Sequence, residues 1–304
     1  SNVNQSLTYT VTSASAGCSP TTFLVNLTVI PVAVIHNKTP AAICSGSSFS
    51  VPLANGVDGD IIVSGTTYTW TTIPNAMITG ASGTNTPTLS PIGQTLTNTS
   101  TTPQTVYYNV TSSSATCAST SFSITVVVNP VPSISTFTTT FCSNDNLVFD
   151  PSTINGNKVP SNTYYTWTAP VNASITGQTS SSGTPTSIVQ NALVNTSSAI
   201  QSMTYVVTPT SPSSPSCAGT TFNINVIINP MPSITSSSVL NPASICSGNT
   251  MTITPTDGGG NIVPNGTTYT WTNSGNTNLQ GQNNLSNQFN GVCHFYLFLL
   301  KINH

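Results

Sequence analysis

The chain has 304 residues, only 3% of them charged, and its formal net charge is −2. Three basic residues cannot form the positively charged face that displaces counterions from nucleic acid, so nucleic-acid partners are excluded. No run of 18 or more apolar residues occurs, which excludes a helix that spans a membrane. Hydrophobic residues make up 37% of the chain and are rich in strand formers, so the composition predicts an all-β protein.

Alternation of apolar and polar residues predicts a hairpin of two β-strands near the start of the chain. This pattern occurs three times, with a cysteine between the two strands, over residues 7–12 and 23–30, 105–111 and 122–128, and 203–208 and 222–228. Each hairpin runs into proline, which cannot donate a hydrogen bond to a neighbouring strand and stiffens the chain. We therefore interpret the proline positions as junctions between domains.

A second cysteine follows each junction, at Cys44, Cys142 and Cys246. After a loop rich in Gly, Asn and Asp comes a strand in which Thr alternates with large aromatic residues. All three tryptophans occupy the same place in this strand, so we expect core positions for Trp70, Trp167 and Trp271. The tryptophans are 97 (167 − 70) and 104 (271 − 167) residues apart, which indicates repeats of about 100 residues, a length typical of β-sandwich domains.

The repeats divide the chain into four segments. Residues 31–130 and 131–230 are expected to form two complete immunoglobulin-like (Ig-like) domains. Residues 1–30 match the closing hairpin, which is the C-terminal half of such a domain, and residues 231–304 match its N-terminal half. The tail at 292–304 departs from the repeats, and we interpret it as a divergent terminal strand or a sequence artefact.

Cysteines recur once at the front and once in the hairpin of each repeat. Cys44 and Cys117 belong to one repeat, and Cys142 and Cys217 belong to the next, with a tryptophan between the members of each pair. This order is that of immunoglobulin domains and predicts the disulfides Cys44–Cys117 and Cys142–Cys217 in an oxidising, extracellular setting. The alternative is a metal site, which would need Cys and His at closer spacing than the sequence offers.

No group of residues in the sequence indicates catalysis, a cofactor or a metal. The three histidines do not recur between repeats, and the chain has five Asp and no Glu. The segment Asp58–Asp60 lies in a loop whose counterparts, Asn155–Asn157 and Asp257–Gly260, have the composition of tight turns. A calcium site at Asp58 and Asp60 is the alternative interpretation. We expect a protein that is not an enzyme and binds no cofactor.

The repeated motifs resemble those of PKD-like repeats, which are Ig-type modules found in tandem in very large secreted surface proteins of Bacteroidota-type bacteria. The resemblance rests on Ile43–Gly46, Thr67–Thr71, Thr105–Thr111 and Val126–Pro130, together with their counterparts along residues 1–291. It implies tandem β-sandwiches, export to the cell surface, and a role as a stalk, adhesin or extracellular filament. It supplies no catalytic residues.

The alternative function is a carbohydrate- or surface-binding adhesion module without catalysis. Such a module would use exposed aromatic rings on one repeat. The candidate rings, Tyr108 and Tyr165, fall within the strand pattern, so we interpret them as core residues.

The incomplete segments at the two ends of the sequence complement each other. Residues 231–291 supply the front strands of a domain and residues 1–30 supply its closing hairpin, so each alone would leave strand edges and half a core uncovered. Either these residues belong to a longer covalent array, or the hairpin of one copy completes the front half of another, which would build an open head-to-tail filament. In both cases we expect Cys246 to bond Cys18 of the neighbouring unit.

Overall fold

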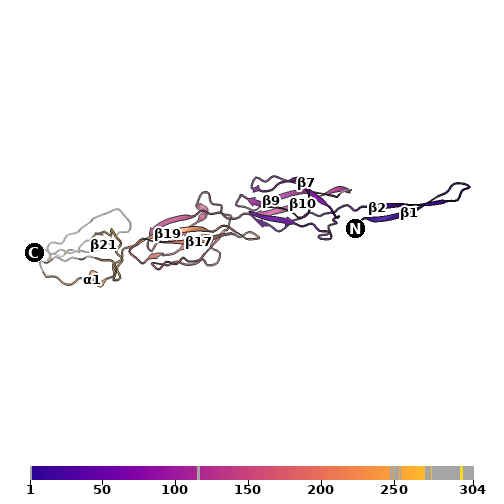
Figure 1. Ribbon diagram of the computed structural model, residues 1–304. Coiled ribbons are helices and arrows are strands. Elements are labelled where there is room, and N and C mark those ends of the chain that lie inside the picture. The colour runs from indigo at the N-terminus through magenta and orange to yellow at the C-terminus, as the bar shows by residue number, and fades with distance from the viewer. Residues whose placement is uncertain are drawn as a thin grey trace. The chain divides into compact units, whose positions relative to one another are not determined.

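The computed structural model describes residues 2–114, 117–246, 249, 253, 255–270, 275 and 295–296. Nearly all its elements are β-strands, and its two helical segments, α1 (Ser237–Leu240) and η1 (Pro151–Thr153), are short (Figure 1). The all-β prediction is confirmed. No helix within these residues is long and apolar enough to cross a membrane. The chain divides into two compact units.

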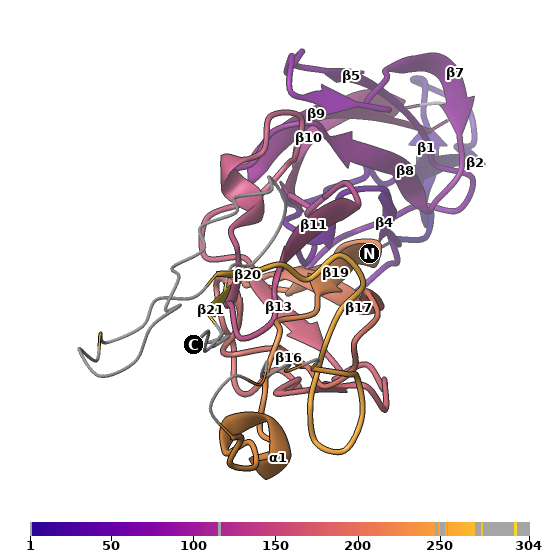
Figure 2. The same cartoon turned by 90° about the vertical axis from the view of Figure 1, so that its left-hand side faces the viewer.

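Unit 1 comprises residues 1–132 with the short segments 160–162 and 210–218. A five-stranded sheet in the order β3-β10-β9-β5-β7 and a three-stranded sheet in the order β4-β8-β6 share one core. Figure 2 shows β5, β9 and β10 side by side in the larger sheet. The strands are β3 (Ile43–Cys44), β4 (Ser47–Val51), β5 (Thr67–Thr72), β6 (Ile78–Thr79), β7 (Thr84–Thr88), β8 (Ile92–Asn98), β9 (Gln104–Ser114) and β10 (Cys117–Asn129).

The core of unit 1 forms because alternate residues of each strand point to the same face. Tyr68 and Trp70 of β5 are buried, as the alternation predicts. Phe49 of the smaller sheet packs on Tyr108 of the larger one, with ring centroids 5.2 Å apart. The Tyr108 hydroxyl donates a hydrogen bond of 2.9 Å to Gln94, which gives the buried phenol the partner that it needs.

Unit 2 comprises residues 133–159, 163–209 and 219–304, and its complete repeat has the same construction. The main sheet has the order β11-β19-β17-β13, and the pairs β12-β15 and β14-β16 form two small sheets. Tyr165, Trp167 and Tyr205 are buried in its core. The strands are β11 (Phe137–Cys142), β12 (Leu147–Phe149), β13 (Tyr164–Trp167), β14 (Ile175–Thr176), β15 (Ile188–Gln190), β16 (Val194–Asn195), β17 (Gln201–Ser211) and β19 (Phe222–Asn229).

The end of β17 and the short strand β18 (Cys217–Ala218) form the tip of the hairpin of the second repeat. This hairpin tip, residues 210–218, is part of unit 1 although the rest of the hairpin is part of unit 2. Within the tip, Ser211 lies opposite Cys217.

The first hairpin of unit 1 pairs β1 (Gln5–Ser13) with β2 (Thr21–Val29), as the sequence predicts. Its register recurs in the two complete repeats, where Tyr9 opposite Val25 corresponds to Tyr108 opposite Ile124 and Tyr205 opposite Ile224. Every residue of β1 and β2 is exposed, whereas the corresponding strands of the complete repeats alternate between buried and less buried residues. The hairpin therefore has the strands of a closing hairpin with its core face uncovered.

The expected front half of a further domain, residues 231–291, is described in part. It contains α1 and the strand β20 (Tyr269–Thr270), which pairs with β21 (Phe295–Tyr296). Trp271 and most of the tail at 292–304 lie outside the described residues.

The disulfide in the structure joins Cys44 to Cys217, with their Cα atoms 5.6 Å apart. The predicted bonds Cys44–Cys117 and Cys142–Cys217 are therefore wrong. The bond that forms connects the front of the first repeat with the hairpin tip of the second, and both ends belong to unit 1.

Strand register explains why the two cysteines of one repeat cannot bond. β3 runs parallel to the end of β10 and places Cys44 opposite Asn129, whereas Cys117 is the first residue of β10. The 13 residues of β10 span about 40 Å at ~3.3 Å per residue. A disulfide tolerates only about 7 Å between Cα atoms. The second repeat has the same register, with Cys142 opposite Asn229.

The core position of Trp167 generates a stability prediction. The indole N–H donates a hydrogen bond of 2.9 Å to the carbonyl of Thr179, and the ring is buried. Trp167→Ala should lower the free energy of unfolding by about 3–5 kcal/mol, because it removes a large buried ring and leaves a cavity. Urea unfolding of the full chain measures this. Val171→Ala, at a side chain that is 98% exposed, is the control and should change stability by less than ~0.5 kcal/mol. Equal effects of the two substitutions would contradict the packing.

Candidate interaction site

A contact that we name the linker clamp recurs at the start of three repeats. The entering segment makes one β-bridge with a later loop: Val34 with Ile61, Ser133 with Lys158, and Ser233 with Ile262. In each repeat, the loop residue that precedes the bridge partner accepts a hydrogen bond through its side-chain oxygen. The donor is a backbone N–H of the entering segment. The pairs are Asp60 with His36, Asn157 with Ser135, and Asn261 with Thr235, each at 2.9 Å. The clamp ties the first residues of each repeat to a loop of that repeat.

The loop that carries the acceptor is a tight turn, as its Gly, Asn and Asp composition predicts. Asp58 and Gly59 have φ values of 53° and 78°, and Gly156 in the second repeat has a φ of 90°. These left-handed conformations are the ones that Gly, Asn and Asp adopt most readily. The tight turn therefore places the acceptor of the clamp next to the entering segment.

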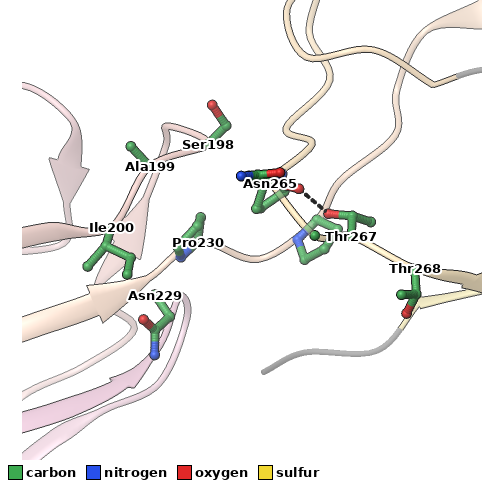
Figure 3. Close-up of a pocket in the computed structure, with 11 residues that line it drawn as sticks. Ser198, Ala199, Ile200, Asn229, Pro230, Asn265, Thr267 and Thr268 are labelled. Atoms are coloured by element: carbon green, nitrogen blue, oxygen red, sulfur yellow. Dashed lines mark hydrogen bonds between the residues drawn. The ribbon is translucent and has the colours of Figure 1, made fainter. Parts of the chain in front are cut away.

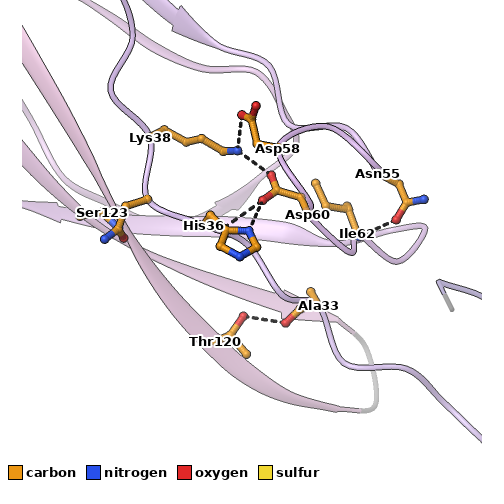
Figure 4. Close-up of polar contacts among 10 residues, drawn as sticks. Ala33, His36, Lys38, Asn55, Asp58, Asp60, Ile62, Thr120 and Ser123 are labelled. Carbon is orange, nitrogen blue, oxygen red and sulfur yellow. Dashed lines mark hydrogen bonds and ion pairs between the residues drawn. The ribbon is translucent and has the colours of Figure 1, made fainter.

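The clamp of the first repeat carries additional charges (Figure 4). Lys38 Nζ lies 2.8 Å from Asp58 Oδ2 and 2.9 Å from Asp60 Oδ2, and His36 Nδ1 lies 3.1 Å from Asp60 Oδ1. Burial acts to raise the pKa of Asp60, but hydrogen bonds from the His36 N–H, from Lys38 and from the His36 ring together hold that pKa below its usual value. Burial acts to lower the pKa of Lys38, and its hydrogen bonds to the two carboxylates raise it.

This arrangement argues against a calcium site at Asp58 and Asp60. The ammonium group of Lys38 occupies the position between the two carboxylates, where a cation would have to bind. Calcium also needs six or more oxygen ligands. In the part of the chain that the structure describes, no three His, Cys, Asp or Glu residues form a group that could hold a metal ion.

The hairpin tip contacts β3 and the end of β10 by more than the disulfide. The side-chain amide of Asn129 donates hydrogen bonds to the carbonyl oxygens of Ser214 at 2.9 Å and Pro215 at 3.3 Å. Cys44 Sγ lies 3.7 Å from the carbonyl oxygen of Ser216. The tip is thus held by one covalent bond and by the amide of a residue directly opposite the bonded cysteine.

A buried asparagine supports the loop beside this contact in each complete repeat. The Asn98 amide donates to the carbonyls of Thr102 and Val128 at 2.8 and 2.9 Å. The Asn195 amide donates to the corresponding carbonyls of Ala199 and Ile228 at 2.8 and 3.0 Å. These bonds fix the loops at 99–103 and 196–200 against the closing strands. A buried amide needs such partners, because an unsatisfied one is costly.

The two supported loops line two cavities at corresponding positions in the two units. The cavity in unit 1 has a volume of about 240 Å³ and is lined by Thr101, Thr102, Pro103, Pro130, Pro160, Ser161, Ser211, Pro212 and Ser213. The cavity in unit 2 has a volume of about 410 Å³ and is lined by residues 198–200, 229–230, 232 and 264–268 (Figure 3). Hairpin-tip residues form part of the wall of the first cavity, and the described wall of the second contains no such tip.

The predicted site residues therefore separate into three groups. Trp70 and Trp167 are buried in the cores, and Cys44 bonds Cys217. Cys18 and Cys246 are exposed, and Cys142 is half-buried. Trp271 and the side chain of Cys117 lie outside the described residues.

Sequence reasoning missed the amides that make these contacts. Asn129 precedes the proline of its junction, as Asn229 does in the next repeat, and this repeated position was the available signal. The acceptors Asp60, Asn157 and Asn261 also recur at one place in the loop. Because the loop has the composition of a tight turn, the sequence indicates turn residues at these positions and does not indicate their role as hydrogen-bond acceptors.

Comparison with known proteins identifies a family. The family model described as PKD-like domain matches residues 41–132 and 139–232. The I-band fragment I67–I69 from titin is 8% identical, with a TM-score of 0.33 and a coverage of 74% of each chain. A protocadherin gammaB7 EC3-6 structure is 14% identical, with a TM-score of 0.27, and the match covers 74% of this chain and 56% of that one. The chain thus spans little more than half of that structure. No curated protein matches the chain.

The charged clamp generates a prediction about pH. Asp60→Asn retains an oxygen acceptor for the His36 N–H, as in the other two clamps, but loses the ion pair with Lys38. Because the folded-state pKa of Asp60 is depressed, its ionisation contributes stability above the unfolded pKa of about 3.8, and this contribution is lost as the pH falls through the lower folded value. Thermal unfolding should show the unsubstituted chain more stable than Asp60→Asn at neutral pH, with a difference that shrinks below about pH 4.

The matched control is Asp58→Asn. The Asp58 side chain is 66% exposed, so loss of its ion pair with Lys38 should change stability by only about 0–1 kcal/mol. A stability difference between the unsubstituted chain and Asp60→Asn that is the same at neutral and acid pH would contradict the proposed role of the Asp60 charge.

Proposed function

Because the chain belongs to the PKD-like domain family, we propose that it is an extracellular structural repeat protein that forms a filament, stalk or adhesin. Its β-sandwich repeats are joined end to end, and copies of the chain associate head to tail. The hairpin β1–β2 of one copy supplies the closing strands of a sandwich, and residues 231–291 of another copy supply its front half.

The uncovered core face of β1–β2 is the observation that carries this proposal. Seven large apolar side chains alternate along it: Leu7, Tyr9, Val11, Phe23, Val25, Leu27 and Val29. Tyr9 is 49% exposed, whereas the corresponding Tyr108 and Tyr205 are fully buried by the front strands of their own repeats. An isolated two-stranded ribbon is at best marginally stable in water, and burial of this face would stabilise it.

The low charge of the hairpin matches the low charge of its proposed partner, residues 231–291. Residues 1–30 contain no charged side chain, and residues 231–291 contain only Asp257. Natural proteins commonly use charged residues to keep exposed strand edges from pairing with other chains. The near absence of charge from the two halves supports pairing between them. In the two complete repeats, the front half of the repeat is the surface that covers this face of the hairpin.

An extracellular location is supported by the disulfide Cys44–Cys217, because disulfides persist in oxidising compartments and are rare in the cytosol. The structural role is favoured over the carbohydrate-binding alternative because Tyr108 and Tyr165, the aromatic candidates, are buried in the cores. The role is non-catalytic in this proposal. The carboxylates of Asp58 and Asp60 both form ion pairs with Lys38.

A pair of leucine substitutions tests the self-association. Leu27 corresponds to Val126 and Val226, which are fully buried, so Leu27→Ser should weaken head-to-tail association by removing a core contact. Leu24 is 63% exposed but corresponds to Ser123 and Asn223 on the opposite face, so Leu24→Ser should leave association unchanged. Sedimentation velocity of the full chain over a concentration series, under reducing conditions, measures both effects.

The two variants remove the same side chain from opposite faces of one ribbon. A monomeric unsubstituted chain at every concentration, or equal loss of association in both variants, would contradict completion by this face. The thermal transition of the two complete repeats serves as the control for folding, because neither leucine contacts their cores.

A further inference from the structure

We propose that the wider cavity of unit 2 receives the β1–β2 hairpin tip of a second copy, and that Cys142 forms a disulfide with Cys18 of that copy. This proposal rests on the head-to-tail completion proposed above, because one docking event brings both contacts together. It replaces the expected bond between Cys246 and Cys18.

Cys142 holds in the second repeat the position that Cys44 holds in the first. Cys44 lies opposite Asn129, and Cys142 lies opposite Asn229. In both repeats the residue after the cysteine donates its N–H to the carbonyl of that asparagine, at 2.8 and 2.9 Å. The backbone around the two cysteines is therefore the same. Since Cys44 bonds the hairpin tip of the following repeat, Cys142 is placed to bond the tip of the repeat after that.

The cavity of unit 2 is the corresponding place for such a tip. In unit 1, Ser211, Pro212 and Ser213 of the tip form one wall of the smaller cavity. In unit 2, the remaining walls are present and the volume is larger, about 410 Å³ against about 240 Å³. The wall that Ser211, Pro212 and Ser213 supply in unit 1 has no counterpart in the described lining of the unit 2 cavity.

The side-chain amide of Asn229 gives this cavity a donor that can bind the backbone carbonyls of a hairpin tip. Asn129 uses its side-chain amide to bind the carbonyls of Ser214 and Pro215 in the docked tip. Asn229 lines the cavity of unit 2 (Figure 3), at the position that Asn129 holds in the first repeat. The backbone carbonyls of an entering tip would satisfy this amide in the way that the tip in unit 1 satisfies Asn129.

The β1–β2 hairpin of a second copy has a tip whose cysteine position and small side chains suit this cavity. Cys18 precedes Phe23 by five residues, as Cys217 precedes Phe222 and as Cys117 precedes Phe122. Cys18 is exposed at the end of a hairpin whose whole length is exposed. Residues 12–17 of its tip are Thr, Ser, Ala and Gly, so no charged or bulky side chain opposes entry into a cavity lined mainly by Ser, Thr, Asn and Pro.

The register of the two complete repeats argues against the bond between Cys246 and Cys18. These two residues would occupy the front and tip positions of one completed sandwich, as Cys44 and Cys117 do in the first repeat. Those positions are separated by the length of a strand of 13 residues, about 40 Å. A cysteine at the tip therefore reaches the front cysteine of the preceding repeat and not that of its own.

Formation of the bond is a two-electron oxidation. The thiols of Cys142 and Cys18 release two protons and two electrons as one S–S bond forms. A small disulfide such as oxidised glutathione accepts them and leaves as two thiols.

Three full-length variants test the pairing, each retaining Cys44, Cys217 and one further cysteine. The Cys18 variant carries C117S, C142S, C246S and C293S, and the Cys142 and Cys246 variants carry the matching sets of Cys→Ser substitutions. Variants are mixed in pairs in a buffer of oxidised and reduced glutathione and separated by electrophoresis without reductant. A mixture of the Cys18 and Cys142 variants should give a covalent dimer, and a mixture of the Cys18 and Cys246 variants should give none.

Sedimentation of the same mixtures separates failure of this pairing from failure of the association itself. Chains that associate without forming a Cys18–Cys142 dimer, or that form a Cys18–Cys246 dimer, would overturn the pairing while leaving the completion of the split domain intact. Chains that do not associate in any mixture would overturn both proposals. Peptide mapping of the dimer band should identify Cys142 and Cys18 in one crosslinked peptide.

Discussion

The parallel pairing of β3 with the end of β10 is the constraint on which the covalent organisation of this protein depends. It holds Cys44 opposite Asn129 and a full strand length away from Cys117. A bond within the repeat is therefore impossible, and the front cysteine bonds a residue 173 positions later. In the chain-entropy model, closing so long a loop restricts the unfolded chain by about 5 kcal/mol. The crosslink thus connects successive repeats instead of reinforcing a single core.

A chain with so few charges makes its recurring polar contacts with neutral amides. Asn98 and Asn195 hold loops to the closing strands, Asn129 holds the hairpin tip, and Asn157 serves as a clamp acceptor. Amide hydrogen bonds are little affected by ionic strength, whereas exposed ion pairs are screened by salt. The low charge also lets neighbouring repeats approach one another with little repulsion. Both properties suit the extracellular repeat structure that we propose.

The sequence predicted the strands well because period-two alternation and burial depend on local pattern alone. The core positions of Trp70 and Trp167 and the strands of the hairpins follow from it. The disulfide prediction failed because the order of Cys, Trp and Cys says nothing about which end of a strand a cysteine occupies. The role of Asp60 as a clamp acceptor was missed for a similar reason. Its partner, His36, is 24 residues away in sequence, and only the folded path of the linker brings the two together.

The central claim, that the front cysteine of one repeat bonds the hairpin tip of the next, is tested most directly by peptide mapping of the oxidised full chain without reduction. Mass spectrometry of a digest made at acid pH, where thiols do not exchange, would identify the crosslinked peptides. The account predicts a peptide that joins Cys44 to Cys217. A peptide that joins Cys44 to Cys117, or Cys142 to Cys217, would contradict it.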